Sequence, residues 1–171
     1  MIHQPDGRLR ALSANQVLEF GWFDYNLYKQ RDFKSLSGSM DTDRINRRFF
    51  EVCMDGSLSV VRRLRRPHGL FKRAFGHPSH YTDQPTMAQD TDHFDYFVHD
   101  AGQLIALDQF YGAIYEPLMT AYDQELQHYA QKHNLNTRSL LGRLVLIDHY
   151  NFLAQKNTQS ASARSYGTIQ D

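Results

Sequence analysis

Several features that mark common classes of protein are missing from this sequence. It has one cysteine, Cys53, and so cannot form a disulfide within the chain, which is usual for proteins of a reducing compartment. It has no apolar run of about 18 residues, the length that spans a bilayer, and residues 1–10 lack the apolar core of a signal peptide. We therefore expect a cytoplasmic protein with no membrane-spanning segment.

The short motifs of several large enzyme families are missing as well. The chain has no glycine-rich phosphate loop, no Gly-x-Ser-x-Gly nucleophile elbow, no Cys-x-x-Cys pair and no His-Glu-x-x-His zinc motif. No other set of residues identifies a reaction. The sequence leaves enzymatic activity open and favours a protein that is not an enzyme.

The composition is that of one ordinary globular domain. The chain has 171 residues, 41% of them hydrophobic, and a domain of this size buries about two thirds of the surface that its unfolded chain exposes. It needs neither a disulfide nor a structural metal to form a core. The C-terminal residues are polar, small and without periodicity, which predicts one domain over residues 1–156 and a flexible tail over residues 157–171.

The formal net charge is zero, but the charges are divided unevenly along the chain. Residues 1–75 hold 14 Lys and Arg against 8 Asp and Glu, a net charge of +6, and residues 76–171 hold 5 against 11, a net charge of −6. No Lys or Arg occurs between Gly76 and His128. This division favours attraction between the two halves, or separate basic and acidic surfaces for different partners.

The first predicted element is an N-terminal helix. Ser13 and Gln16 have the spacing of a capping box, in which each side chain bonds the backbone of the other residue. Bulky apolar residues follow, with Gly21 as a possible kink. These signals predict a helix over residues 14–30.

The strongest local signal is that of a β-hairpin. Two β-prone runs flank the dipeptide Asp55-Gly56, which favours a tight type I′ turn, so a hairpin is expected over residues 47–64. If this dipeptide is the whole loop, Val52 lies opposite Ser59. Neither face of the hairpin is wholly polar, and we expect other parts of the chain to cover both faces.

The C-terminal half predicts a third strand and a helical hairpin. Apolar and polar residues alternate over residues 93–99, and Asp100 follows with the pattern of a helix N-cap. Apolar residues then recur every three or four positions, which predicts antiparallel helices over residues 101–133 and 137–156. Their contact is expected to contain Leu107, Tyr111, Ile114, Leu118, Leu141, Leu144 and Phe152. The predicted fold class is α+β, with an N-terminal helix, a small antiparallel sheet and a C-terminal helical hairpin.

A basic stripe follows the predicted hairpin. Six Arg and Lys residues lie here among apolar and aromatic ones, a pattern that can bind phosphates and stack on bases. Balanced overall charge is unlike a dedicated nucleic-acid-binding protein, so a protein partner or an internal ion-pair network is the favoured interpretation. The candidate residues are Arg62, Arg63, Arg65, Arg66, Lys72 and Arg73.

Histidines and carboxylates gather over residues 77–100, where they could bind a metal. Nitrogen and oxygen ligands of this kind suit zinc or iron, and strand alternation would place three of them on one face. Nine histidines in the chain make some clustering expected by chance, and the main expectation is that no cofactor binds. The candidate ligands are His77, His80, His93, Asp95 and His99.

These observations favour a non-catalytic interaction or assembly protein. Its clearest signals are aromatic-rich and arginine-rich segments, which suit a contact with a protein partner or a larger assembly. Two alternatives stay open. One is a small metal-dependent enzyme that uses the cluster at residues 77–100, and the other is a nucleic-acid-binding accessory protein that uses the stripe from Arg62 to Arg73.

Overall fold

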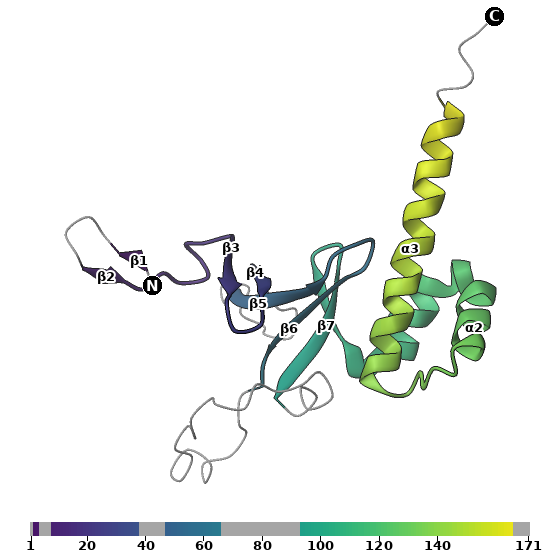
Figure 1. The fold of residues 1–171 in the computed structure, drawn as a ribbon, viewed down its shortest axis with the longest axis horizontal. Coiled ribbons are helices and arrows are strands. Elements are labelled where there is room, and N and C mark those ends of the chain that lie inside the picture. Colours follow the sequence, from purple (N-terminus) through teal and green to yellow (C-terminus); the bar gives the residue numbers. More distant parts are fainter. Residues whose placement is uncertain (1, 4–7, 38–46, 66–92, 166–171) are drawn as a thin grey trace, which may run out of the picture.

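The computed structural model describes residues 2–3, 8–37, 47–65 and 93–165 (Figure 1). A six-stranded sheet lies in the middle of the molecule, the helices lie at one end, and a small β1–β2 hairpin lies at the other end. The strands are β1 (Ile2–His3), β2 (Leu9–Arg10), β3 (Glu19–Asp24), β4 (Lys29–Ser37), β5 (Arg47–Met54), β6 (Ser59–Leu64), β7 (Phe94–Asp100) and β8 (Gln103–Ala106). The helical segments are η2 (Leu107–Gln109), η3 (Phe110–Met119), η4 (Thr120–Tyr122), α2 (Asp123–Lys132) and α3 (Leu140–Ser165). The predicted α+β class is confirmed.

The sheet is an antiparallel meander. Its strands lie side by side in chain order from β3 to β8, and every neighbouring pair is antiparallel. Because side chains alternate between faces along a strand, the register assigns each residue to a face. We call the face with Val60 and Val98 the helix-side face, and the face with Val61 and Phe97 the outer face.

The β5–β6 hairpin forms where the sequence predicts it, but its expected register is wrong. Val52 lies opposite Val61 instead of Ser59, since β5 ends at Met54 and four residues separate the two strands. The register also shifts between Val52 and Met54, as in a β-bulge at Cys53. A tight turn at Asp55-Gly56 would leave no room for these extra residues.

The predicted N-terminal helix over residues 14–30 is wrong, because this segment forms β3 and β4. One of the two capping-box bonds forms: the Gln16 side chain accepts a hydrogen bond from the Ser13 N–H at 3.1 Å. It closes a single turn, in which the Gln16 N–H donates to the Ser13 carbonyl at 3.0 Å. The aromatic residues that follow prefer strands, and pairing with β4 overrides the local helical signal.

The predicted bounds of the C-terminal helices are also wrong. Asp100 ends β7 instead of capping a helix, and Ala101 and Gly102, with φ of 45° and 82°, turn the chain into β8. The first helical segment therefore starts at Leu107 rather than 101. The second starts at 140 and continues through residues 157–165, the first part of the predicted tail.

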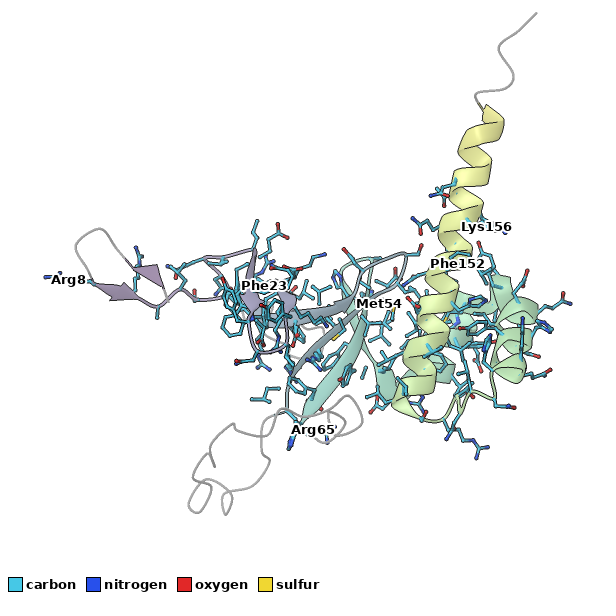
Figure 2. All side chains as sticks on the ribbon, viewed as in Figure 1. Arg8, Phe23, Met54, Arg65, Phe152 and Lys156 are labelled. Atoms are coloured by element: carbon cyan, nitrogen blue, oxygen red, sulfur yellow. The ribbon has the colours of Figure 1, made fainter. Side chains whose placement is uncertain are left out.

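The main core joins the helix-side face to the helices. Strand residues Val60 and Val98 pack there with helical residues, and Met54 lies between the sheet and α3 (Figure 2). The buried members are Leu58, Val60, Val98, Leu107, Phe110, Ile114, Met119, Leu126, Leu146 and Ile147. A smaller cluster on the outer face contains Phe50, Val61, Phe97 and Leu104. Burial of these apolar side chains is the main force that holds the sheet and helices together.

Candidate protein-binding surface

The β3–β4 hairpin presents large apolar side chains to solvent. Trp22 is 56% exposed, Tyr25 is 78% exposed and Tyr28 is 84% exposed. A contiguous exposed group of such residues marks an interaction site, because soluble proteins seldom leave large apolar patches open. The exposed large apolar residues in or beside this hairpin are Leu18, Phe20, Trp22, Phe23, Tyr25, Leu27 and Tyr28. We call this set the aromatic hairpin surface.

The loop that carries the tyrosines is shaped by Asp24. One carboxylate oxygen of Asp24 accepts hydrogen bonds from the backbone N–H of Asn26 at 3.0 Å and of Leu27 at 3.2 Å. Tyr28 completes the turn with a φ of 49°, in the left-handed region that a bulky residue seldom adopts. The aspartate turn therefore defines the backbone that presents Tyr25 and Tyr28.

Four rings gather on the helix-side face, beyond the part that the helices cover. Phe20 stacks on Phe33 with ring centroids 4.8 Å apart, and it meets Phe49 edge-on at 5.0 Å. Trp22 meets Phe33 edge-on at 6.2 Å. Ring pairs of this kind contribute about 0.5–1.5 kcal/mol beyond the area that they bury. The group thus positions Phe20 and Trp22 while it leaves them exposed.

Phe23 extends the aromatic hairpin surface to the outer face of the sheet. Its ring meets Tyr25 at 5.1 Å and Tyr28 at 5.9 Å, both edge-on. Figure 2 shows Phe23 on β3, at the part of the sheet far from Phe152 of α3. Exposed rings therefore lie on both faces of the edge strand β3.

An ion-pair network separates the four rings from the core of the same face. Glu51 is 6% exposed and accepts two hydrogen bonds from Arg31, at 2.9 and 2.7 Å, and two from Arg62, at 2.9 and 3.3 Å. Arg62 also donates to the Tyr96 hydroxyl at 3.2 Å, and its guanidinium lies 4.3 Å from the centroid of the Phe94 ring. The strands β4, β5, β6 and β7 each supply one member or more.

All three charged groups of this network stay ionised at neutral pH. Burial is the largest influence on Glu51 and raises its pKa, but the hydrogen bonds from Arg31 and Arg62 together lower the pKa below its ordinary value of 4.5. Burial lowers the pKa of Arg62, yet its bonds to Glu51 and Tyr96 leave that pKa raised. The hydrogen bond to Glu51 raises the pKa of Arg31. Arg31 also lies 3.5 Å from the Asp24 carboxylate, so two arginines face two acidic residues within the sheet, which is typical of a structural network.

Three members of the predicted basic stripe are described, and each faces an acidic partner. Arg62 binds Glu51, as above, and Arg65 lies 2.8 Å from Asp95, with Arg63 at 4.0 Å from the same carboxylate. Asp95 belongs to the acidic half of the sequence, so part of the stripe attracts that half, as one interpretation predicted. Contact with nucleic acid stays a prediction. The candidates Arg66, Lys72 and Arg73 lie outside the described residues.

The predicted metal ligands are only partly placed. Asp95 and His99 share the outer face of β7, as alternation predicts, and Asp95 is engaged by arginines. Within the described ranges, no three His, Cys, Asp or Glu side chains come together as a possible metal site. His93 precedes β7, and the candidates His77 and His80 lie outside those ranges. The metal-dependent enzyme stays an untested alternative.

A second, smaller group of rings lies between α2 and α3. Tyr129 stacks on His149 with centroids 3.8 Å apart, and it also contacts His133 at 4.4 Å. Burial lowers the pKa of His149. Phe152, 6.1 Å from His149, is 58% exposed. Phe152 is the one exposed large apolar side chain in this group, so it provides a control for the larger aromatic hairpin surface.

Comparison with known proteins identifies no relative. No protein family matches this chain, and neither a curated protein nor a solved structure shows significant similarity to it. No helix in the described part of the chain is long and apolar enough to cross a membrane.

Sequence reasoning expected an aromatic contact surface but did not locate it. The sequence predicted Phe20, Trp22, Tyr25 and Tyr28 as apolar groups of a helix. Phe20, Trp22 and Asp24 are two positions apart and share one face in β3, which is the spacing of a strand. Alternation over residues 19–24 is the local signal for this strand, and the exposure of its rings follows from its place at the edge of the sheet.

Proposed function

We propose that this protein is a non-catalytic interaction protein that binds a protein partner through the aromatic hairpin surface. The observation that carries this proposal is the exposure of seven large apolar residues on one hairpin, while Val60, Val98 and Phe97 of the same sheet are buried. Leaving so many apolar groups in water costs free energy, which a partner recovers by covering them.

The chemistry of the surface suits a protein contact. Trp and Tyr are the residues that contribute most to protein interfaces, because they bury much area with few rotatable bonds. Charged residues of both signs lie on the same two strands as the rings, with Glu19 and Asp32 against Lys29 and Lys34. An apolar centre within a mixed polar rim is the usual arrangement of such an interface.

The exposed aromatic residues are better suited to bind a protein partner than the arginines are. Arg62 and Arg63 face Glu51 and Asp95, so a partner that bound them would have to compete with ion pairs already made. The rings of Trp22 and Tyr25 have no such competition to overcome, since water is their main neighbour. We therefore assign the contact to the hairpin.

Affinity capture with matched variants tests this proposal. Tagged full-length chain would capture proteins from a lysate of its source cells, alongside Trp22→Ser and Phe152→Ser. Both variants remove one exposed ring, from the hairpin and from α3 respectively. We expect a partner that the native chain and Phe152→Ser retain and Trp22→Ser loses, and titration with the purified partner should reproduce the difference. Equal retention by both variants would contradict the proposal.

A further inference from the structure

In the described part of the chain, no strand lies beside the outer edge of β3. Among the described strands, β3 pairs with β4 alone, and β8 is the other edge of the sheet. Natural edge strands are usually short, charged, bulged or interrupted by proline, which prevents pairing with other chains. β8 has four residues and its Leu104 is buried. β3 has six residues and no proline or lysine, its charged residues Glu19 and Asp24 lie only at its two ends, and the rings of Phe20 and Trp22 are exposed between them. β3 therefore lacks the usual protection.

The hydrogen-bond pattern shows which backbone groups of β3 face outward. The Ser35 N–H donates to the Leu18 carbonyl at 2.7 Å, in the same register as the β3–β4 pairs. In an antiparallel ladder, residues alternate between bonding one neighbour and facing the other side. The even-numbered residues of β3 thus bond β4. The N–H and C=O groups of Glu19, Gly21 and Phe23 point to the open edge.

We propose that a second copy of this chain pairs with this edge, β3 against β3, across a two-fold axis at Gly21. This inference rests on the proposed role of the aromatic hairpin surface and names its partner. An antiparallel pair centred on Gly21 joins Glu19 of each copy to Phe23 of the other. All three outward residues then find a partner, whereas sliding the strands by two positions leaves one of them outside the ladder.

The side chains of β3 suit this register. Phe20 of one copy lies opposite Trp22 of the other, in a non-hydrogen-bonded pair where side chains approach most closely. Two such pairs extend the ring groups of both helix-side faces into one aromatic cluster, and aromatic pairs across strands are favourable. The acidic residues Glu19 and Asp24 do not face each other. The zero formal charge of the chain also avoids net repulsion between copies.

The symmetry of the contact limits its size. A two-fold interface uses the same patch on both copies, so pairing covers both β3 edges and ends at a dimer. A strand from another protein could bond the same backbone groups. The sedimentation experiment below distinguishes this case, because the native chain alone would then be monomeric. Pairing with a copy has the further property that one substitution changes both halves of the interface.

Matched substitutions at Phe23 test the register. Phe23→Lys would place a cation opposite Glu19 twice, and Phe23→Glu would place two like charges there. Both variants lose the same contacts to Tyr25 and Tyr28 and both face uncharged Gln30 of β4. Sedimentation equilibrium over a range of concentrations should show a dimer for the native chain and a dissociation constant for Phe23→Glu at least about tenfold above that of Phe23→Lys. A monomeric native chain, or equal weakening by both variants, would overturn the inference.

Amide hydrogen exchange provides a second readout that needs no variant. The amides of Glu19, Gly21 and Phe23 should become more protected as the protein concentration rises, while those of Phe20 and Trp22 stay protected throughout. If the protection of these outward amides does not change with protein concentration, the proposed dimer is overturned. If the chain is monomeric but Trp22→Ser still loses a captured partner, the proposed function stands and only the choice of partner fails.

Discussion

Glu51 is a buried carboxylate at the centre of the ion-pair network. Its carboxylate takes four hydrogen bonds from Arg31 and Arg62, and both arginines are mostly covered. Removing one partner of such a buried set leaves charge without compensation, which costs far more than the net contribution of the pair. The same three residues connect β4, β5 and β6. They therefore also stabilise β4, the strand that pairs with β3 in the aromatic hairpin surface.

We predict that Glu51→Gln lowers the free energy of unfolding by about 3 kcal/mol at neutral pH. The folded-state pKa of Glu51 is lowered, so the stability due to its charge is present above the ordinary value of 4.5 and is lost as pH falls through the folded pKa. The difference between the native protein and the variant should therefore shrink in acid. Urea unfolding at neutral and acidic pH measures it, and an equal difference at both would contradict the prediction.

Asn151 joins α3 to the loop between β5 and β6. Its side-chain oxygen accepts from the Leu58 N–H at 2.8 Å, and its amide nitrogen donates to the Leu58 carbonyl at 2.9 Å. Both groups are buried, and Gly56 lies so close that an added Cβ would stand 2.7 Å from the Asn151 side chain. A side chain with one donor and one acceptor is therefore required at this position.

We predict that Asn151→Asp costs about 2 kcal/mol at neutral pH, because the carboxylate cannot donate to the Leu58 carbonyl. Burial beside that carbonyl raises the pKa of the new acid, and its protonated form can donate again. The loss should therefore be smaller in acid and grow as pH rises. Thermal unfolding across this range measures it. A loss that is independent of pH would show that the bond to the carbonyl contributes little.

At the scale of elements, α3 shows that helical periodicity in the sequence does not identify which face of a helix is buried. The sequence predicted that Leu141, Leu144 and Phe152 face inward, but Leu141 and Phe152 are 61% and 58% exposed. Leu146 and Ile147 are buried in the main core instead, and Leu144 is half-buried. α3 is rich enough in apolar residues that more than one of its faces could pack. The contact with the sheet selects the face.

Two alanine substitutions in α3 separate these alternatives. We predict that Ile147→Ala lowers the free energy of unfolding by about 2–5 kcal/mol, because it opens a cavity in a fully buried site. Leu141→Ala, in the same helix, should change it by less than about 1 kcal/mol. Denaturant unfolding of both variants measures the difference. A larger loss of stability for Leu141→Ala than for Ile147→Ala would contradict the burial of the Ile147 face of α3.

At the scale of the whole molecule, the sheet and the helices share one core. Val60 and Val98 of the central strands pack with Ile114, Leu126 and Ile147, so neither part can bury its apolar face alone. The aromatic hairpin surface lies beyond this core, on strands β3 and β4, and reaches it through β5 and the Glu51 network. The proposed interface thus lies on β3 and β4, two strands that extend the sheet beyond the main core.

We predict that the sheet and the helices unfold together. Trp22 is the single tryptophan, so its fluorescence reports the β3 edge, while far-UV ellipticity reports mainly α2 and α3. The two midpoints in denaturant should coincide, as in a two-state transition, and Ile147→Ala should move both by the same amount. Fluorescence that changes at lower denaturant than ellipticity would show that β3 and β4 open separately.

The sequence predicted candidate site residues whose side-chain type indicates a role, such as charged groups. It missed residues whose role depends on whether other parts of the chain cover them. Arg62, Arg63 and Arg65 were predicted from their charge as a partner contact or an internal ion-pair network, and they lie beside the carboxylates of Glu51 and Asp95. Trp22 and Tyr25 were recognised only as bulky apolar groups. Whether such a group is core or contact surface depends on what covers it, which no local pattern states.

Local sequence patterns were enough to predict the α+β class, the β5–β6 hairpin and the β7 strand, because alternation and turn residues act over a few neighbours. Tertiary structure alone decided that residues 19–37 are strands, since pairing with β5 outweighs one capped turn. It also decided the register at Cys53, the start of the helices after β8, and the inward face of α3. Each of these depends on contacts between distant residues, whose energies exceed the small local preferences that a sequence displays.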